Sequence, residues 1–206
     1  MAADKENSSC ATGEGKTLRK SFIDGKLTSS KTDGSDKLAL VRSLGETKKA
    51  EGHLLLGYDD LYSIQYFGEN LRPYWNRNGN ETIQSQFAKA DKEYDAVMDK
   101  CAAFDANLMK EATEVGGRKY AELCALAYRQ AIAAHKLVEA PNKDLLFLSK
   151  ENFSNGSIGT VDITYPSAPL FLVYNPELAK GLMNHIFYYS ESGKWNKPFA
   201  AHDVGT

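Results

Sequence analysis

A long apolar repeat between residues 83 and 108 sets the strongest limit on the fold. Its members follow one another at helical spacings, mostly of three and four: Ile83, Phe87, Ala90, Tyr94, Val97, Met98, Cys101, Phe104 and Leu108. This period places them along one face of an α-helix. The pattern ends at Gly116 and Gly117, and glycine is the usual residue just past a helix C-terminus. The sequence therefore predicts one long amphipathic helix over residues 81–117.

Three further segments also have helical patterns. Residues 61–72 carry apolar side chains at helical spacing, with Asp60 as a candidate N-cap and a stop at Pro73. Residues 118–138 are apolar on nearly every side, which is typical of a helix buried against several neighbours. Residues 175–192 begin with Asn-Pro, and proline suits the first helical position. The sequence therefore predicts helices over all three segments.

The first fifty residues have a different composition, which is rich in Lys, Ser, Thr, Asp and Gly. Short apolar runs occur within residues 16–27, 36–45 and 51–60. Gly and Asp clusters between such runs predict strands joined by turns. Because three short strands make a marginal sheet on their own, this region reads as the end of a larger β-domain.

Composition narrows the possible partners. The chain has 206 residues, of which 42% are hydrophobic and 25% charged, and its formal net charge is -2. This balance disfavours nucleic acid and anionic membranes as partners. The longest apolar runs fall well short of the roughly 20 residues of a membrane-spanning helix. The three cysteines have no CxxC or metal-type spacing, so we predict no disulfide framework, no metal site and no cofactor.

Several long phrases of the chain are similar to one known family. They read "LLLGYDDLYSIQYFGENLRPYW", "YAELCALAYRQAIAAHKLV", "LLFLSKENFSNGSIGTVDITYPSAPLFLVYNPELAKGLMNHIFYYSESGKW" and "KPFAAHDVGT". From about Gly52 to the last residue, the chain resembles the microbial glutaminase A family. The resemblance implies a six-helical-hairpin (α/α)6 toroid preceded by a β-sandwich domain, in a mainly α protein that hydrolyses L-glutamine to L-glutamate and ammonia.

The resemblance also sets expectations about organisation. Residues 1–51 are expected to be the C-terminal remnant of the sandwich, and residues 52–206 the N-terminal part of an incomplete hairpin domain. The chain then looks like a fragment whose partner is the rest of its own polypeptide. Family members are typically exported, so we expect a periplasmic or extracellular protein, although residues 1–16 do not form a secretory signal.

An irregular stretch, residues 151–172, is the candidate wall of a central cavity. Long loops inside compact domains are usually functional or disordered. Gly156 and Gly159 allow positive φ, and we expect Pro166 and Pro169 to hold the segment extended before the next helix. On this interpretation the stretch carries chemistry.

Amide hydrolysis needs a base, an acid and donors for a tetrahedral oxyanion. Two carboxylates in different environments can supply the first two. Asp203, in a loop beside Gly205, is the first candidate, and Asp162 or Glu151 is its complement. Candidate substrate-binding residues are Arg129 for the α-carboxylate, Tyr165 and His202. As alternatives, the loop carboxylates form turns and Arg129 forms a structural ion pair.

Two other functions stay open at this point. The same pair of carboxylates would serve an inverting glycosidase acting on a glycan, and the fold alone does not choose between amide and glycoside chemistry. A noncatalytic helical module is the third possibility. The sequence contains no G-x-S-x-G elbow, H-E-x-x-H motif or Walker loop, which disfavours serine, metal and nucleotide mechanisms.

Overall fold

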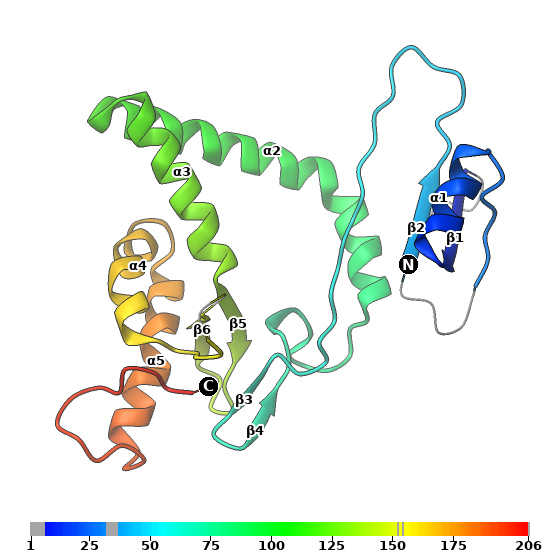
Figure 1. Ribbon diagram of the computed structural model, residues 1–206. Coiled ribbons are helices and arrows are strands. Elements are labelled where there is room, and N and C mark those ends of the chain that lie inside the picture. The colour runs from blue at the N-terminus through cyan, green and yellow to red at the C-terminus, as the bar shows by residue number, and fades with distance from the viewer. Residues whose placement is uncertain (1–6, 32–36, 152, 154, 206) are drawn as a thin grey trace. The chain divides into compact units, whose positions relative to one another are not determined.

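The computed structural model describes residues 7–31, 37–151, 153 and 155–205 (Figure 1). It divides into two compact units, Met1–Leu56 and Gly57–Thr206. The division falls a few residues beyond residue 51. The assignment of the first unit to a β-sandwich remnant, and of the rest to an incomplete hairpin domain, stays a prediction. As expected, the chain is mainly helical with a few short antiparallel strands.

The first unit pairs two strands and one helix. Strands β1 (Ser8–Gly13) and β2 (Lys37–Arg42) are antiparallel, and α1 (Gly15–Ile23) lies between them in sequence. The strand expected within residues 36–45 is confirmed. The strand expected within 16–27 is wrong, because Leu18 and Phe22 are four residues apart and line one hollow with strand residues. Residues 51–60 form no strand.

The second unit begins with a strand pair where a helix was predicted. Strands β3 (Ile64–Tyr66) and β4 (Glu69–Leu71) are antiparallel and precede a short 3-10 turn, η1 (Tyr74–Asn76). Phe67 and Gly68 join the strands with φ of 47° and 95°. Positive φ at both central residues is typical of a type I′ hairpin turn. The predicted helix over 61–72 is therefore wrong.

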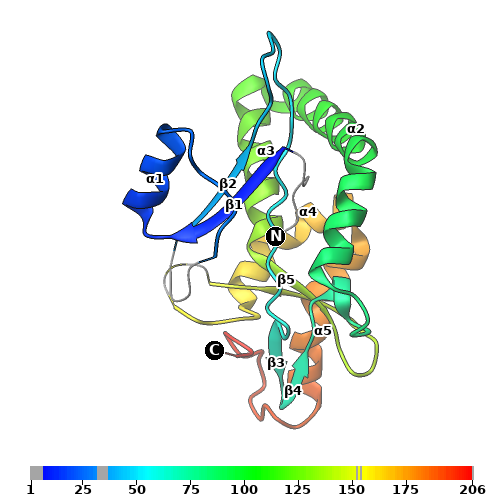
Figure 2. The same cartoon turned by 90° about the vertical axis from the view of Figure 1, so that its right-hand side faces the viewer.

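The long helix is confirmed as α2 (Ile83–Gly116). It starts at a capping box, in which the Thr82 hydroxyl accepts from the Ser85 N–H at 3.1 Å. Gly117, with φ of 81°, separates it from α3 (Arg118–Ala133). Figure 2 shows the two helices meeting at that junction. None of the described helices is long and apolar enough to cross a membrane.

Helix α3 differs from its prediction in length and burial. It ends at Ala133 because residues 135–139 form a strand instead. Ala121 is its one buried residue, and Leu123 is 62% exposed. The expected helix enclosed on several faces is therefore wrong for the described residues. The helix packs mainly on α2, and the tilted rings of Tyr128 and Phe104 are in contact at a centroid distance of 4.9 Å.

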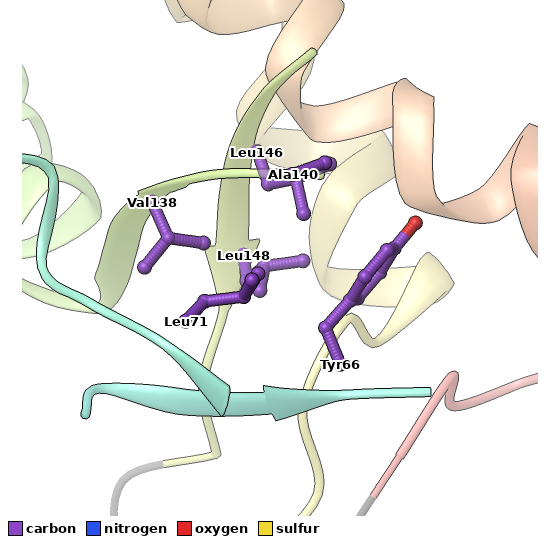
Figure 3. Packing of buried hydrophobic residues seen from close by; sticks show 6 residues of the cluster. All are labelled: Tyr66, Leu71, Val138, Ala140, Leu146 and Leu148. Carbon is purple, nitrogen blue, oxygen red and sulfur yellow. The ribbon is translucent and has the colours of Figure 1, made fainter. Parts of the chain in front are cut away.

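The core of the second unit lies between two hairpins. Strands β5 (His135–Glu139) and β6 (Leu145–Ser149) are antiparallel. Figure 3 shows the side chains that fill the space between this hairpin and β3–β4: Tyr66, Leu71, Val138, Ala140, Leu146 and Leu148. Since strand side chains alternate between faces, Phe147 points the other way and packs on Phe171 and Leu182.

Those last two residues belong to a helical hairpin, α4 (Val161–Tyr174) and α5 (Pro176–Glu191). The helix predicted over 175–192 is confirmed as α5. The expected extended conformation around Pro166 and Pro169 is wrong, because both lie inside α4. The carbonyls that lose a helical donor there belong to the exposed residues Asp162 and Tyr165, where water can replace the bond.

Candidate functional site

The candidate site lies where the end of β6, the loop 157–160, the start of α4 and residues 201–205 meet. Backbone hydrogen bonds hold these segments together. The Ile158 N–H donates to the Gly205 carbonyl at 2.9 Å, and the Val161 N–H donates to the His202 carbonyl at 2.8 Å. The Gly159 N–H donates to the Ser149 carbonyl at 2.8 Å. The C-terminal segment is thereby placed against the N-terminus of α4.

A chain of polar side chains crosses this junction. The Thr160 hydroxyl donates to Oδ1 of Asp203 at 2.5 Å. Oδ2 of Asp203 lies 2.9 Å from Nδ1 of His202. On the other side of the ring, Nε2 of His202 lies 3.3 Å from Oδ2 of Asp162. One imidazole is thus flanked by two carboxylates that are far apart in the sequence.

The contacts among Asp162, His202 and Asp203 shift the pKa values of His202 and Asp203 toward their charged forms. The hydrogen bond with Asp203 raises the pKa of His202, and the negative charges of Asp162 and Asp203 raise it further. The hydrogen bond from Thr160 lowers the pKa of Asp203, and the one from His202 adds to this. The arrangement therefore favours an ionised Asp203 beside a protonated imidazole. All three side chains remain in contact with solvent.

Buried groups fix the Thr160 donor in place. Thr160 and Ser149 are both fully buried. The Ser149 hydroxyl accepts from the Thr160 N–H at 3.0 Å and lies 3.4 Å from the Thr160 carbonyl, to which Thr164 also donates at 3.1 Å. Because the backbone of Thr160 is held on both sides, its hydroxyl has little freedom to leave Asp203.

His185 of α5 lies beneath the loop and is fully buried. Burial lowers its pKa to about 4, which the backbone groups of Gly181 and Gly159 oppose in part. Neither ring nitrogen has a hydrogen-bond partner of ordinary geometry among the described residues. Gly159 touches the ring, since a Cβ placed on it would lie 2.8 Å from Cδ2 of His185. The neutral ring thus forms the floor of the loop.

The structure brings together three of the six residues that the sequence pointed to, namely Asp162, His202 and Asp203. Tyr165 lies on α4 three residues after Asp162 and is 83% exposed. The backbone N–H of Glu151 donates to the Ser157 carbonyl, at the start of the site loop. Arg129 is exposed on α3, has no hydrogen bond or ion pair with the described residues, and does not join the cluster.

Sequence reasoning missed Thr160 and Ser149. Thr160 stands directly before the first residue of α4, where threonine is a common cap, yet its side chain makes no capping bond. Within the described part of the chain, no group of three or more His, Cys, Asp and Glu side chains is arranged to hold a metal ion.

Two family models match this chain and define its class of protein. The family model of the glutaminase A six helical-hairpin domain matches residues 117–206, and that of a domain of unknown function, DUF5127, matches residues 1–111. The chain therefore carries part of a six-helical-hairpin protein. It belongs to the glutaminase A family.

Two curated relatives agree with this assignment. Glutaminase A of Aspergillus oryzae is 31% identical over 82% of this chain and 25% of its own length. A probable glutaminase of Arthroderma benhamiae is 32% identical over 50% of this chain and 12% of its own length. The matched part is thus at most a quarter of either relative. No solved structure matches the chain.

Proposed function

We propose that this chain supplies part of the active site of a glutaminase, which hydrolyses the side-chain amide of L-glutamine to L-glutamate and ammonia. The observation that carries the proposal is the placement of His202 between Asp162 and Asp203 at the N-terminus of α4. The names of the relatives, glutaminase A and probable glutaminase, support the choice of substrate.

Each of the three side chains has a role that suits its surroundings. Asp162 is the general base, because its carboxylate is exposed and reaches solvent water. The activated water attacks the amide carbon and forms a C–O bond. Protonated His202 then donates its proton to the departing nitrogen as the C–N bond breaks, and ammonia leaves. Both carboxylates favour the imidazolium form that this step requires.

Asp203 acts on His202 rather than on the substrate. Its two oxygens are engaged by Thr160 and His202, which suits a residue that orients the imidazole and stabilises its charge. The N–H groups of Asp162 and Ile163 in the first turn of α4 are the candidate donors to the oxyanion, because the Val161 N–H already donates to the His202 carbonyl. They are available because the Thr160 side chain donates to Asp203 and makes no capping bond.

The proposal is tested by ammonia release from L-glutamine, in a polypeptide that contains this chain in its natural length. Asp162→Asn and His202→Gln should each lower kcat by about a hundredfold to ten-thousandfold, with little change in melting temperature. The matched control is Asp99→Asn on the exposed face of α2, which should leave turnover unchanged. Normal turnover in both site variants, or equal losses of activity and stability, would refute the assignment.

A glycoside assay on the same preparations separates the alternative chemistry. If the unmodified protein hydrolyses a glycoside and leaves L-glutamine intact, the substrate assignment is wrong even if both site variants are inactive. Binding of the substrate α-carboxylate by Arg129 and export from the cell stay predictions. An increase in KM with unchanged kcat in Arg129→Met would support the first.

A further inference from the structure

A polar cleft lies elsewhere in the same unit, and none of its lining residues belongs to the site described above. It has a volume of about 240 Å³ and lies between the end of the β3–β4 hairpin and the turn that joins β5 to β6. Its charged lining consists of Arg72, Arg77, Glu139 and Lys143. Three cations therefore surround one carboxylate.

The single carboxylate is already shared between two of these cations. Oε1 of Glu139 lies 2.8 Å from Nζ of Lys143, and Oε2 lies 3.6 Å from Nε of Arg77. Arg72 has no ion pair with any residue that the structure describes, although it is partly buried. Partly buried charges are normally paired, because removing them from water is costly. The cleft thus holds an uncompensated positive charge.

Both arginines are held in place by aromatic rings. The Arg72 guanidinium lies over the Tyr62 ring at 5.2 Å, and that of Arg77 lies over Tyr74 at 4.2 Å. Gly79 also lies against Arg72, since a Cβ placed on it would lie 3.2 Å from Nε. Stacking uses the face of a guanidinium and leaves the N–H groups at its edge able to form two parallel bonds to an oxyanion.

We propose that this cleft binds a small oxyanion, a carboxylate or phosphate group, through the edge of Arg72. Arg77 and Lys143 add charge, and the two tyrosine rings reduce the entropy lost on binding because they hold the arginines in one orientation. Planar or tetrahedral oxyanions match the geometry of the arginine donors. The cavity has room for such a group together with a few further atoms of a small molecule.

The test is a calorimetric titration of the full 206-residue chain with inorganic phosphate, and separately with succinate, at constant ionic strength. Arg72→Met keeps an unbranched apolar side chain at this position but removes the guanidinium and its donors. We expect saturable binding that weakens about tenfold or more in Arg72→Met. The control Arg118→Met removes an exposed arginine of α3 that is paired with Glu122, and should change nothing.

A second variant covers the case in which Arg72→Met fails to fold. Glu139→Gln removes the competing carboxylate and releases Lys143 and Arg77, so it should bind phosphate more tightly than the unmodified chain. A gain of affinity is not an effect that general destabilisation produces. Absence of saturable binding, equal affinity in Arg72→Met, or unchanged or weaker binding in Glu139→Gln would each overturn the proposal. None of these readouts depends on glutamine turnover.

Discussion

Replacing Gly159 with alanine should destabilise the second unit and disturb the candidate site together. Gly159 has φ of 67°, and a Cβ there would lie 2.8 Å from Cδ2 and 2.9 Å from Nε2 of His185. The left-handed conformation costs an alanine about 1–2 kcal/mol. Forcing a methyl against a fully buried ring costs about 1–3 kcal/mol more. We therefore expect the free energy of unfolding to fall by about 2–5 kcal/mol.

Urea unfolding of the 206-residue chain measures this loss. Gly156→Ala is a matched control in the same loop, because a Cβ on Gly156 meets nothing within 4 Å and its φ is not in the left-handed region. It should change the free energy of unfolding by less than about 0.5 kcal/mol. If Gly159→Ala is as stable as Gly156→Ala, the loop does not pack rigidly on the His185 ring, and the proposed close contact between Gly159 and His185 is wrong.

Three shorter predictions follow from other contacts. The pKa of His202, followed by NMR, should lie above 6.5, and it should fall in Asp203→Asn. Because folding raises this pKa, the stabilisation from protonated His202 should be present below pH 6.5 and be lost as pH rises through the raised pKa. His185 is fully buried and has a pKa of about 4, so the free energy of unfolding should fall by about 3 kcal/mol as pH falls from about 6.5 to about 4. Urea unfolding of His185→Leu over the same pH range should not show this decrease. Thr82→Ala should lower the free energy of unfolding by about 1 kcal/mol in the same assay, because α2 loses its capping box.

The parts of the fold that could be predicted are those whose signals are local and long. Helix α2 repeats its period over many turns and ends at glycine, so no other structure suits its sequence. Helix α5 has an Asn-Pro start whose Asn175 side chain does accept from the Leu178 N–H, at 3.3 Å. In both segments, propensity, pattern and capping agree.

The segments that were misassigned carry patterns that satisfy two periods at once. Ile64 and Phe67 are three residues apart, as on one face of a helix, yet Ile64 and Tyr66 alternate as strand residues do. The choice is made by the turn at Phe67 and Gly68 and by the apolar face of β5–β6 on which the hairpin packs. That face is contributed by residues about seventy positions later, so a local window does not contain the deciding information.

The candidate site also has a part that local sequence predicts and a part that depends on distant segments. Asp162, His202 and Asp203 could be proposed because ionisable residues near helix termini are recognisable by type and position, although Asp162, expected in a loop, lies in the first turn of α4. The contacts among these three residues could not be predicted, because those contacts depend on the pairing of residues 202–205 with residues 158–161. Thr160 shows why composition misleads here: its hydroxyl is in capping position but donates to Asp203 instead. The N–H groups of Asp162 and Ile163 therefore receive no side-chain cap and lie beside an imidazole flanked by carboxylates. The local cap that sequence rules favour is thus absent at the position where the proposed chemistry needs those donors.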